Sequence, residues 1–106
     1  MSGVSYFLKR KIANLYTENE KKLNQLDPEA LTSFASELLK LIREEKEKAG
    51  SLHDLDVLEG SMKHLKKDSE ELKKSKPGTD DYEFAANDCK NLVNSTKKWL
   101  KMENLI

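Results

Sequence analysis

Apolar residues recur at every third or fourth position along most of the chain. This spacing places side chains on one face of an α-helix, and no stretch shows the two-residue alternation of a half-buried strand. Three short breaks divide the pattern into four amphipathic stretches. The spacing therefore predicts an all-α fold.

The first two breaks carry residues that end or begin helices. Asp27 can cap a helix, and the following Pro28 suits the first helical position because the N–H there has no partner anyway. At the second break, Gly50 can adopt the left-handed backbone that closes a helix. Ser51, followed three residues later by Asp54, resembles a capping box. Both breaks therefore predict one helix ending and another beginning.

The third break contains Pro77 and Gly78, after which Asp80 or the competing Thr79 caps a new helix. Helices of about 20–25 residues joined by such short loops pack best as antiparallel neighbours. We therefore predict an antiparallel up-down four-helix bundle that forms a single domain. A three-helix bundle is the alternative, if the second break bends a helix instead of reversing the chain. The predicted domain is 1–106 and the predicted helices are 4–26, 28–49, 52–75 and 80–103.

Three positions on the apolar seams are polar, namely Asn19, Ser69 and Thr96. Buried polar groups need hydrogen-bond partners, and they fix helix register at some cost in stability. These residues therefore either set the register of the bundle or face a groove that binds another helix. The apolar seam residues are Val4, Leu8, Ile12, Leu15, Leu23, Leu26, Leu31, Phe34, Leu38, Leu41, Ile42, Leu55, Leu58, Met62, Leu65, Leu72, Tyr82, Ala85, Cys89, Leu92 and Trp99.

The charges balance, with 19 basic and 19 acidic residues and a formal net charge of zero. Nucleic-acid-binding domains normally carry a basic face or stripe. Lysines do crowd the third and fourth stretches, so weak nucleic-acid binding through lysine-rich faces is one alternative function. Zero net charge also removes an electrostatic barrier to self-association, which is compatible with a homo-oligomer.

Nothing in the sequence indicates export or membrane insertion. No apolar run approaches the ~20 residues of a spanning helix, and residues 1–11 lack the apolar core of a signal peptide. Cys89 is the single cysteine, so no internal disulfide can form, which fits a reducing compartment. We therefore expect a soluble, cytoplasmic protein without a transmembrane segment.

No group of residues has the spacing of a catalytic or cofactor-binding motif. His53 and His64 are 11 residues apart, about three helical turns, which is too far for the two to share a metal ion. Cys89 lies on an apolar seam, where no neighbouring base would activate its thiol. We therefore expect no enzymatic activity, no metal site, no cofactor and no small-molecule substrate.

Several large apolar residues lie off the seams, and such clusters often mark interfaces. We predict that they bind a protein partner, so that the chain is a non-enzymatic protein–protein interaction module or a small regulatory or adaptor domain. The alternative is an inhibitory or immunity-type protein that neutralises a toxin or a membrane-directed peptide, since bundles of about this length occur among bacteriocin immunity proteins. The predicted partner-binding residues are Tyr6, Phe7, Trp99, Met102 and Leu105, and Tyr16 also lies off the seam.

Overall fold

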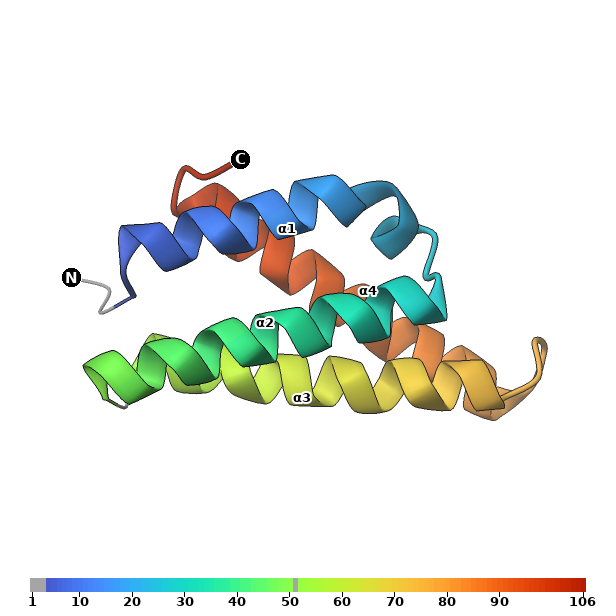
Figure 1. Ribbon diagram of the computed structural model, residues 1–106. Coiled ribbons are helices and arrows are strands. Elements are labelled where there is room, and N and C mark those ends of the chain that lie inside the picture. Colours follow the sequence, from blue (N-terminus) through green and yellow to red (C-terminus); the bar gives the residue numbers. More distant parts are fainter. Residues whose placement is uncertain (1–3, 51) are drawn as a thin grey trace.

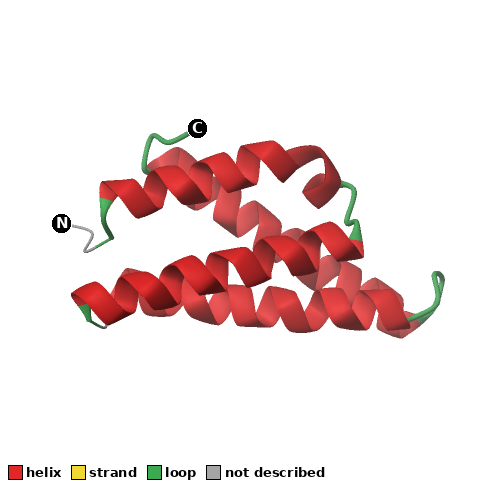
Figure 2. Ribbon diagram, viewed as in Figure 1, coloured by secondary structure: helices red, strands yellow, loops and turns green. Residues whose placement is uncertain are grey.

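The chain folds into four α-helices, shown in Figure 1 as a computed structural model that describes residues 4–50 and 52–106. The helices are α1 (Tyr6–Asn24), α2 (Pro28–Ala49), α3 (His53–Lys74) and α4 (Asp80–Met102). The described residues contain no β-strand, as Figure 2 shows. The predicted all-α class and the division into four helices are confirmed, and the three-helix alternative is not realised.

Both ends of α2 follow the signals in the sequence. The Asp27 carboxylate accepts a hydrogen bond from the backbone N–H of Glu29 at 3.1 Å, and Pro28 occupies the first helical position. Gly50 ends the helix with a φ of 81°, and its N–H donates to the carbonyl of Lys46. This φ favours glycine because it places a Cβ atom too close to the backbone.

The other helix starts differ in their caps. Ser5 caps α1 through its hydroxyl, which accepts from the N–H of Leu8 at 3.2 Å. Thr79, rather than Asp80, caps α4. Asp80 instead lies in the first turn, where a negative charge interacts favourably with the helix dipole. Ser51, the expected cap of α3, lies outside the described residues, and Leu52 at the cap position makes no side-chain cap hydrogen bond.

α1 ends at Asn24, whereas the sequence pattern predicts helix to residue 26. Leu26 has a φ of 57°, in the left-handed region that side chains other than glycine rarely adopt. The N–H of Asp27 donates back to the carbonyl of Lys22, five residues earlier, as in a Schellman motif. Leu26 also packs against the core, and the partial burial of its side chain offsets part of the backbone strain.

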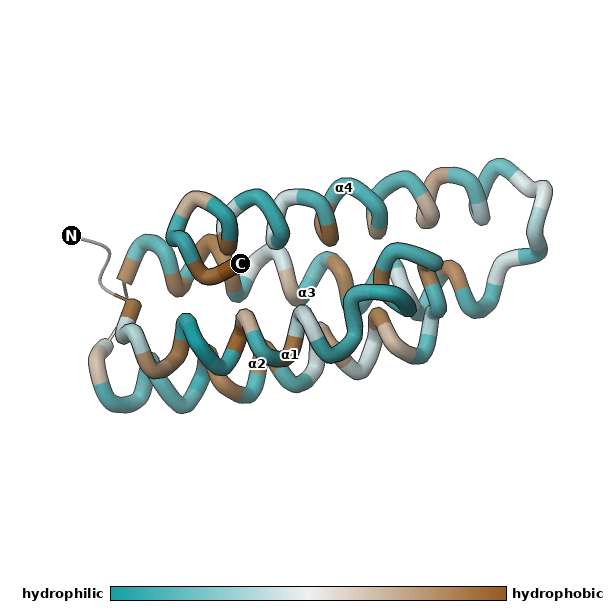
Figure 3. The backbone as a smooth tube through the Cα atoms, turned by 90° about the horizontal axis from the view of Figure 1, so that it is seen from above, coloured by the Kyte–Doolittle hydropathy of each residue, from teal (hydrophilic) through white to brown (hydrophobic). Residues whose placement is uncertain are grey.

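The helices pack around one apolar core, and Figure 3 shows hydrophobic segments recurring along each of them. The sequence pattern placed Tyr16 off the apolar seam, but the structure places its side chain in the core. Its ring is fully buried and meets Phe34 edge-on, with the ring centroids 6.3 Å apart. Helical position 16 turns inward because α1 buries a wide face between α2 and α4. The largest fully buried side chains are Tyr16, Phe34, Ile12, Leu23, Leu31, Leu38, Ile42, Leu55, Met62, Leu65, Leu72 and Leu100.

The polar seam residues find partners inside the bundle. The hydroxyl of Ser69 on α3 lies 2.7 Å from that of Thr32 on α2, and it donates to the carbonyl of Lys66. Thr96 and Asn19 each donate to a carbonyl one turn earlier in their own helix. These bonds favour a role in the bundle over a role in binding another helix.

The direction of the chain reverses from each helix to the next in Figure 1. Packing is most extensive between α2 and α3, and the contact between α1 and α4 is smaller. The start of α1, the end of α2, the start of α3 and the end of α4 therefore lie together. The ion pair between Lys9 and Glu103, with Nζ and Oε2 3.0 Å apart, joins the first and last of these. We call this region, comprising residues 4–11, 42–50, 52–58 and 95–106, the terminal end.

Candidate functional site

The predicted partner-binding residues all belong to the terminal end, but they differ in exposure. Tyr6, Phe7 and Met102 are 72%, 70% and 74% exposed, respectively. Trp99 and Leu105 are only partly exposed and pack against the core. The ring of Phe7 carries the ammonium group of Lys11 at 4.5 Å from its centroid, which orients it on the surface of α1.

Two more exposed apolar side chains at this end were not among the predicted partner-binding residues, although Ile106 was recognised in the sequence as lying off the seams. Val57 lies one turn into α3, and Ile106 follows Leu105, whose carbonyl oxygen accepts a hydrogen bond from Arg10 at 3.4 Å. Phe84, near the start of α4 at the opposite end, is 73% exposed. Val57 is an apolar residue that lies off the apolar seam of the third stretch. This position in the sequence could have indicated that its side chain is exposed.

A hollow of about 220 Å³ lies between α3 and α4 at the terminal end. Apolar side chains of Val57 and Trp99 line it together with polar groups of both helices. Its size suits one or two side chains of another molecule. The full lining is His53, Asp54, Val57, Leu58, Ser61, Ser95, Thr96 and Trp99.

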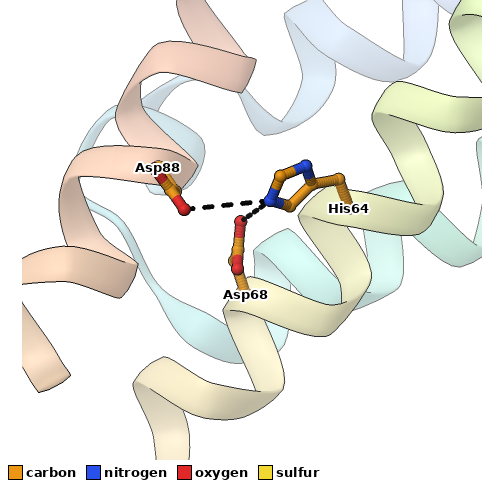
Figure 4. Close-up of side chains that lie close together, drawn as sticks. All are labelled: His64, Asp68 and Asp88. Carbon is orange, nitrogen blue, oxygen red and sulfur yellow. Dashed lines mark ion pairs between the residues drawn. The ribbon is translucent and has the colours of Figure 1, made fainter.

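His64 and Asp68 on α3 meet Asp88 on α4, as Figure 4 shows. Nε2 of His64 lies 3.0 Å from Oδ2 of Asp68 and 3.8 Å from Oδ2 of Asp88. One ligand-type atom from each residue falls within 4.8 Å of the other two. The spacing between His53 and His64 in the sequence does not indicate this group, because its third member is on another helix. The four-residue spacing from His64 to Asp68 was the available signal.

Burial governs the electrostatics of this cluster. The side chain of Asp68 is only 14% exposed, and its Oδ2 is buried without a hydrogen-bond partner. Burial raises the pKa of the Asp68 carboxyl, and the neighbouring charge of Asp88 acts in the same direction, whereas His64 opposes them. Oδ2 lies within ion-pair distance of Nε2 of His64 but accepts no hydrogen bond.

Cys89 is buried beside this cluster. Burial raises the pKa of its thiol to about 12, and the negative charges of Asp68 and Asp88 add to the shift. The thiol is therefore protonated at neutral pH and shielded from solvent. Because the thiolate is the reactive form, Cys89 is a packing residue in this structure.

Comparison with known proteins found no match: no family model matches the sequence, and neither a curated protein nor a solved structure is similar to it. Among the described residues, no helix combines the length and the apolar character that are needed to cross a bilayer. Four-helix bundles carry many unrelated functions, so function must be argued from the surface and the side-chain clusters of this chain.

Proposed function

We propose that this protein is a non-enzymatic protein–protein interaction module that binds its partner through the terminal end. The observation that carries the proposal is the uneven distribution of exposed apolar side chains. Of the six large exposed apolar residues in the described chain, all except Phe84 belong to the terminal end. The remaining five are Tyr6, Phe7, Val57, Met102 and Ile106.

Burial of these side chains against a partner would contribute free energy of binding through the hydrophobic effect. Complete burial of a large apolar side chain is worth about 1.5–3 kcal/mol, and most of the surface of Phe7 and Met102 remains available for burial. Charged residues such as Lys9, Lys11 and Glu103 lie around them. An apolar centre with a polar rim is the common composition of a protein interface.

The proposal includes the antiparallel up-down arrangement of the helices, which gathers both chain ends at one end of the bundle and which the short loops between the helices favour. The reversals of the chain in Figure 1 and the packing of consecutive helices support it. An inhibitory or immunity-type role is the special case in which the partner is a toxin or a peptide. Acidic residues are interspersed with the α3 lysines, and Lys73 lies 3.6 Å from Glu29, so nothing favours nucleic acid as the partner.

The test compares two surface variants in a pull-down from the cells that naturally make the protein. The double variant Phe7→Ser, Met102→Ser removes two terminal-end side chains, and Phe84→Ser removes an equally exposed aromatic ring from the opposite end. We expect the double variant to weaken binding of a stoichiometric partner about a hundredfold, since each 1.4 kcal/mol is a factor of ten. Phe84→Ser should bind like the wild type.

Circular dichroism checks that both variants keep their helical content. Equal loss of the partner in both variants would contradict the proposed surface, as would full retention by the double variant. Recovery of the bait alone would direct the test to self-association, measured by sedimentation equilibrium. In that case, a dimer that persists in the double variant would also rule out the terminal end as the surface of self-association.

A further inference from the structure

We propose that His64, Asp68 and Asp88 form a binding site for a divalent transition-metal ion of the zinc type, which links α3 to α4. The proposal does not depend on the interaction surface, and it departs from the sequence-based expectation of no metal site. It rests on the ligand types, their geometry, and the lack of other partners for the buried carboxylate.

The ligand types and their positions suit such an ion. His64 and Asp68 are four residues apart, so their side chains lie on the same face of α3, and Asp88 approaches from α4 (Figure 4). Zinc binds imidazole nitrogen and carboxylate oxygen at about 2.0–2.2 Å, which places tetrahedral ligand atoms roughly 3.4 Å apart. The observed separations of 3.0 and 3.8 Å from Nε2 fall on either side of that value.

Apart from His64, the two carboxylates have no ion-pair partner among the described residues, although the charge of Lys67 acts on Asp68 from a greater distance. In the described part of the chain, no lysine or arginine forms an ion pair with Asp68 or Asp88. Oδ2 of Asp68 is buried and accepts no hydrogen bond. Buried charges in proteins are normally paired or coordinate metals, and a doubly charged ion would balance these two carboxylates.

The imidazole ring of His64 presents one nitrogen, Nε2, to both carboxylates (Figure 4). A metal ion held between the three ligand atoms would bind the lone pair of this nitrogen in the neutral ring. Figure 4 shows the other ring nitrogen turned away from both aspartates.

The site is open on one side. The side chain of His64 is 57% exposed, so solvent reaches the cluster from this direction. Three protein ligands leave at least one coordination position for water in a tetrahedral zinc site. An entry path and a solvent ligand are therefore both available without rearrangement of the helices.

The experiment uses the tag-free, full-length chain after removal of metal with a chelator. Titration with Co²⁺ is followed by visible absorption, and Zn²⁺ is then titrated by calorimetry. Three variants are compared with the wild type: His64→Gln, Asp88→Asn and the control His53→Gln. His53 is the other histidine, is also exposed, and belongs to the same helix.

We expect one Zn²⁺ per chain in the wild type and in His53→Gln. Loss of a ligand should weaken binding at least tenfold in His64→Gln and Asp88→Asn, because even residues that only support the ligands contribute about ten- to a hundredfold. Both substitutions lie at partly exposed side chains, and circular dichroism verifies that each variant is folded.

Two results would overturn the proposal. The first is the absence of saturable binding by the folded wild type in excess Zn²⁺ or Co²⁺, which would leave His64 as the partner of an ordinary ion pair. The second is binding that is unchanged in His64→Gln and Asp88→Asn or is lost equally in His53→Gln. That outcome would place the bound metal elsewhere on the chain.

Discussion

Replacing Tyr16 with phenylalanine should not destabilise the protein, although Tyr16 is one of the most deeply buried residues. Its ring belongs to the core, but its hydroxyl is buried and makes no hydrogen bond of ordinary geometry, although the Glu20 carboxylate lies close enough to raise its pKa. Leaving a buried polar group unpaired costs about 1–3 kcal/mol. Tyr16→Phe removes that group and keeps the ring, so we expect unchanged stability or a gain of up to about 2 kcal/mol.

Urea denaturation at neutral pH measures this change. Tyr6→Phe is the matched control because Tyr6 is exposed, and surface substitutions usually stay within about 0.5 kcal/mol. Tyr16→Ala should cost about 3–5 kcal/mol, which would show that the assay detects the loss of the buried ring. A loss of 1 kcal/mol or more in Tyr16→Phe would refute the reasoning and would indicate that the hydroxyl is hydrogen-bonded, with the carboxylate of Glu20 as the candidate acceptor.

The stability difference between the wild type and Tyr16→Phe should also depend on pH. Burial, followed by the charge of Glu20, raises the pKa of Tyr16 above its ordinary value of 10.0. The unfolded chain therefore releases this proton at lower pH than the folded chain. The stability associated with the neutral phenol is complete below pH 10 and is lost as pH rises through the folded-state pKa. Above pH 10 the free energy of unfolding of Tyr16→Phe should consequently rise relative to that of the wild type, by at most about 1.4 kcal/mol per pH unit.

Three further predictions concern a cap, a turn and the thiol. Asp27→Ala should lower the free energy of unfolding by about 1 kcal/mol in urea, because the carboxylate caps α2; no change would mean that the cap is replaced by water. Asn104 has a φ of 58°, so Asn104→Ala should destabilise by about 1 kcal/mol whereas Asn104→Gly should not, and equal effects in thermal unfolding would argue against the left-handed turn. Cys89 should react with a thiol reagent at pH 8 only when urea is added, and rapid reaction of the folded protein would contradict its burial.

Local features of the sequence determine the helices because each signal acts within a few residues. Asp27 and Pro28 begin α2 through a side-chain cap and a fixed φ, and Gly50 ends it through a left-handed backbone. The period of the apolar residues also identifies most of the core, since it only requires a helix to bury one face. These signals need no knowledge of which helices become neighbours.

Local signals in the sequence predict backbone conformation and burial less well where packing between helices competes with them. Leu26 adopts a left-handed backbone that its residue type disfavours, and its side chain packs on the core. Tyr16 is buried because α1 has neighbours on two sides, which a single seam does not predict. Leu105 looks equivalent to Met102 in the sequence, yet packing leaves only Met102 strongly exposed.

Only the tertiary structure decides which distant residues meet. The register between α3 and α4 brings Asp88 to His64 and Asp68, and a shift of one helical turn, about 5.4 Å, would separate them. The direction of the helices likewise places the start of α1, which contains Phe7, at the same end of the bundle as the end of α4, which contains Met102. The sequence by itself determined four amphipathic helices, because helix formation is local. The tertiary structure decided their common end and the histidine–aspartate cluster, because both depend on packing between helices far apart in the chain.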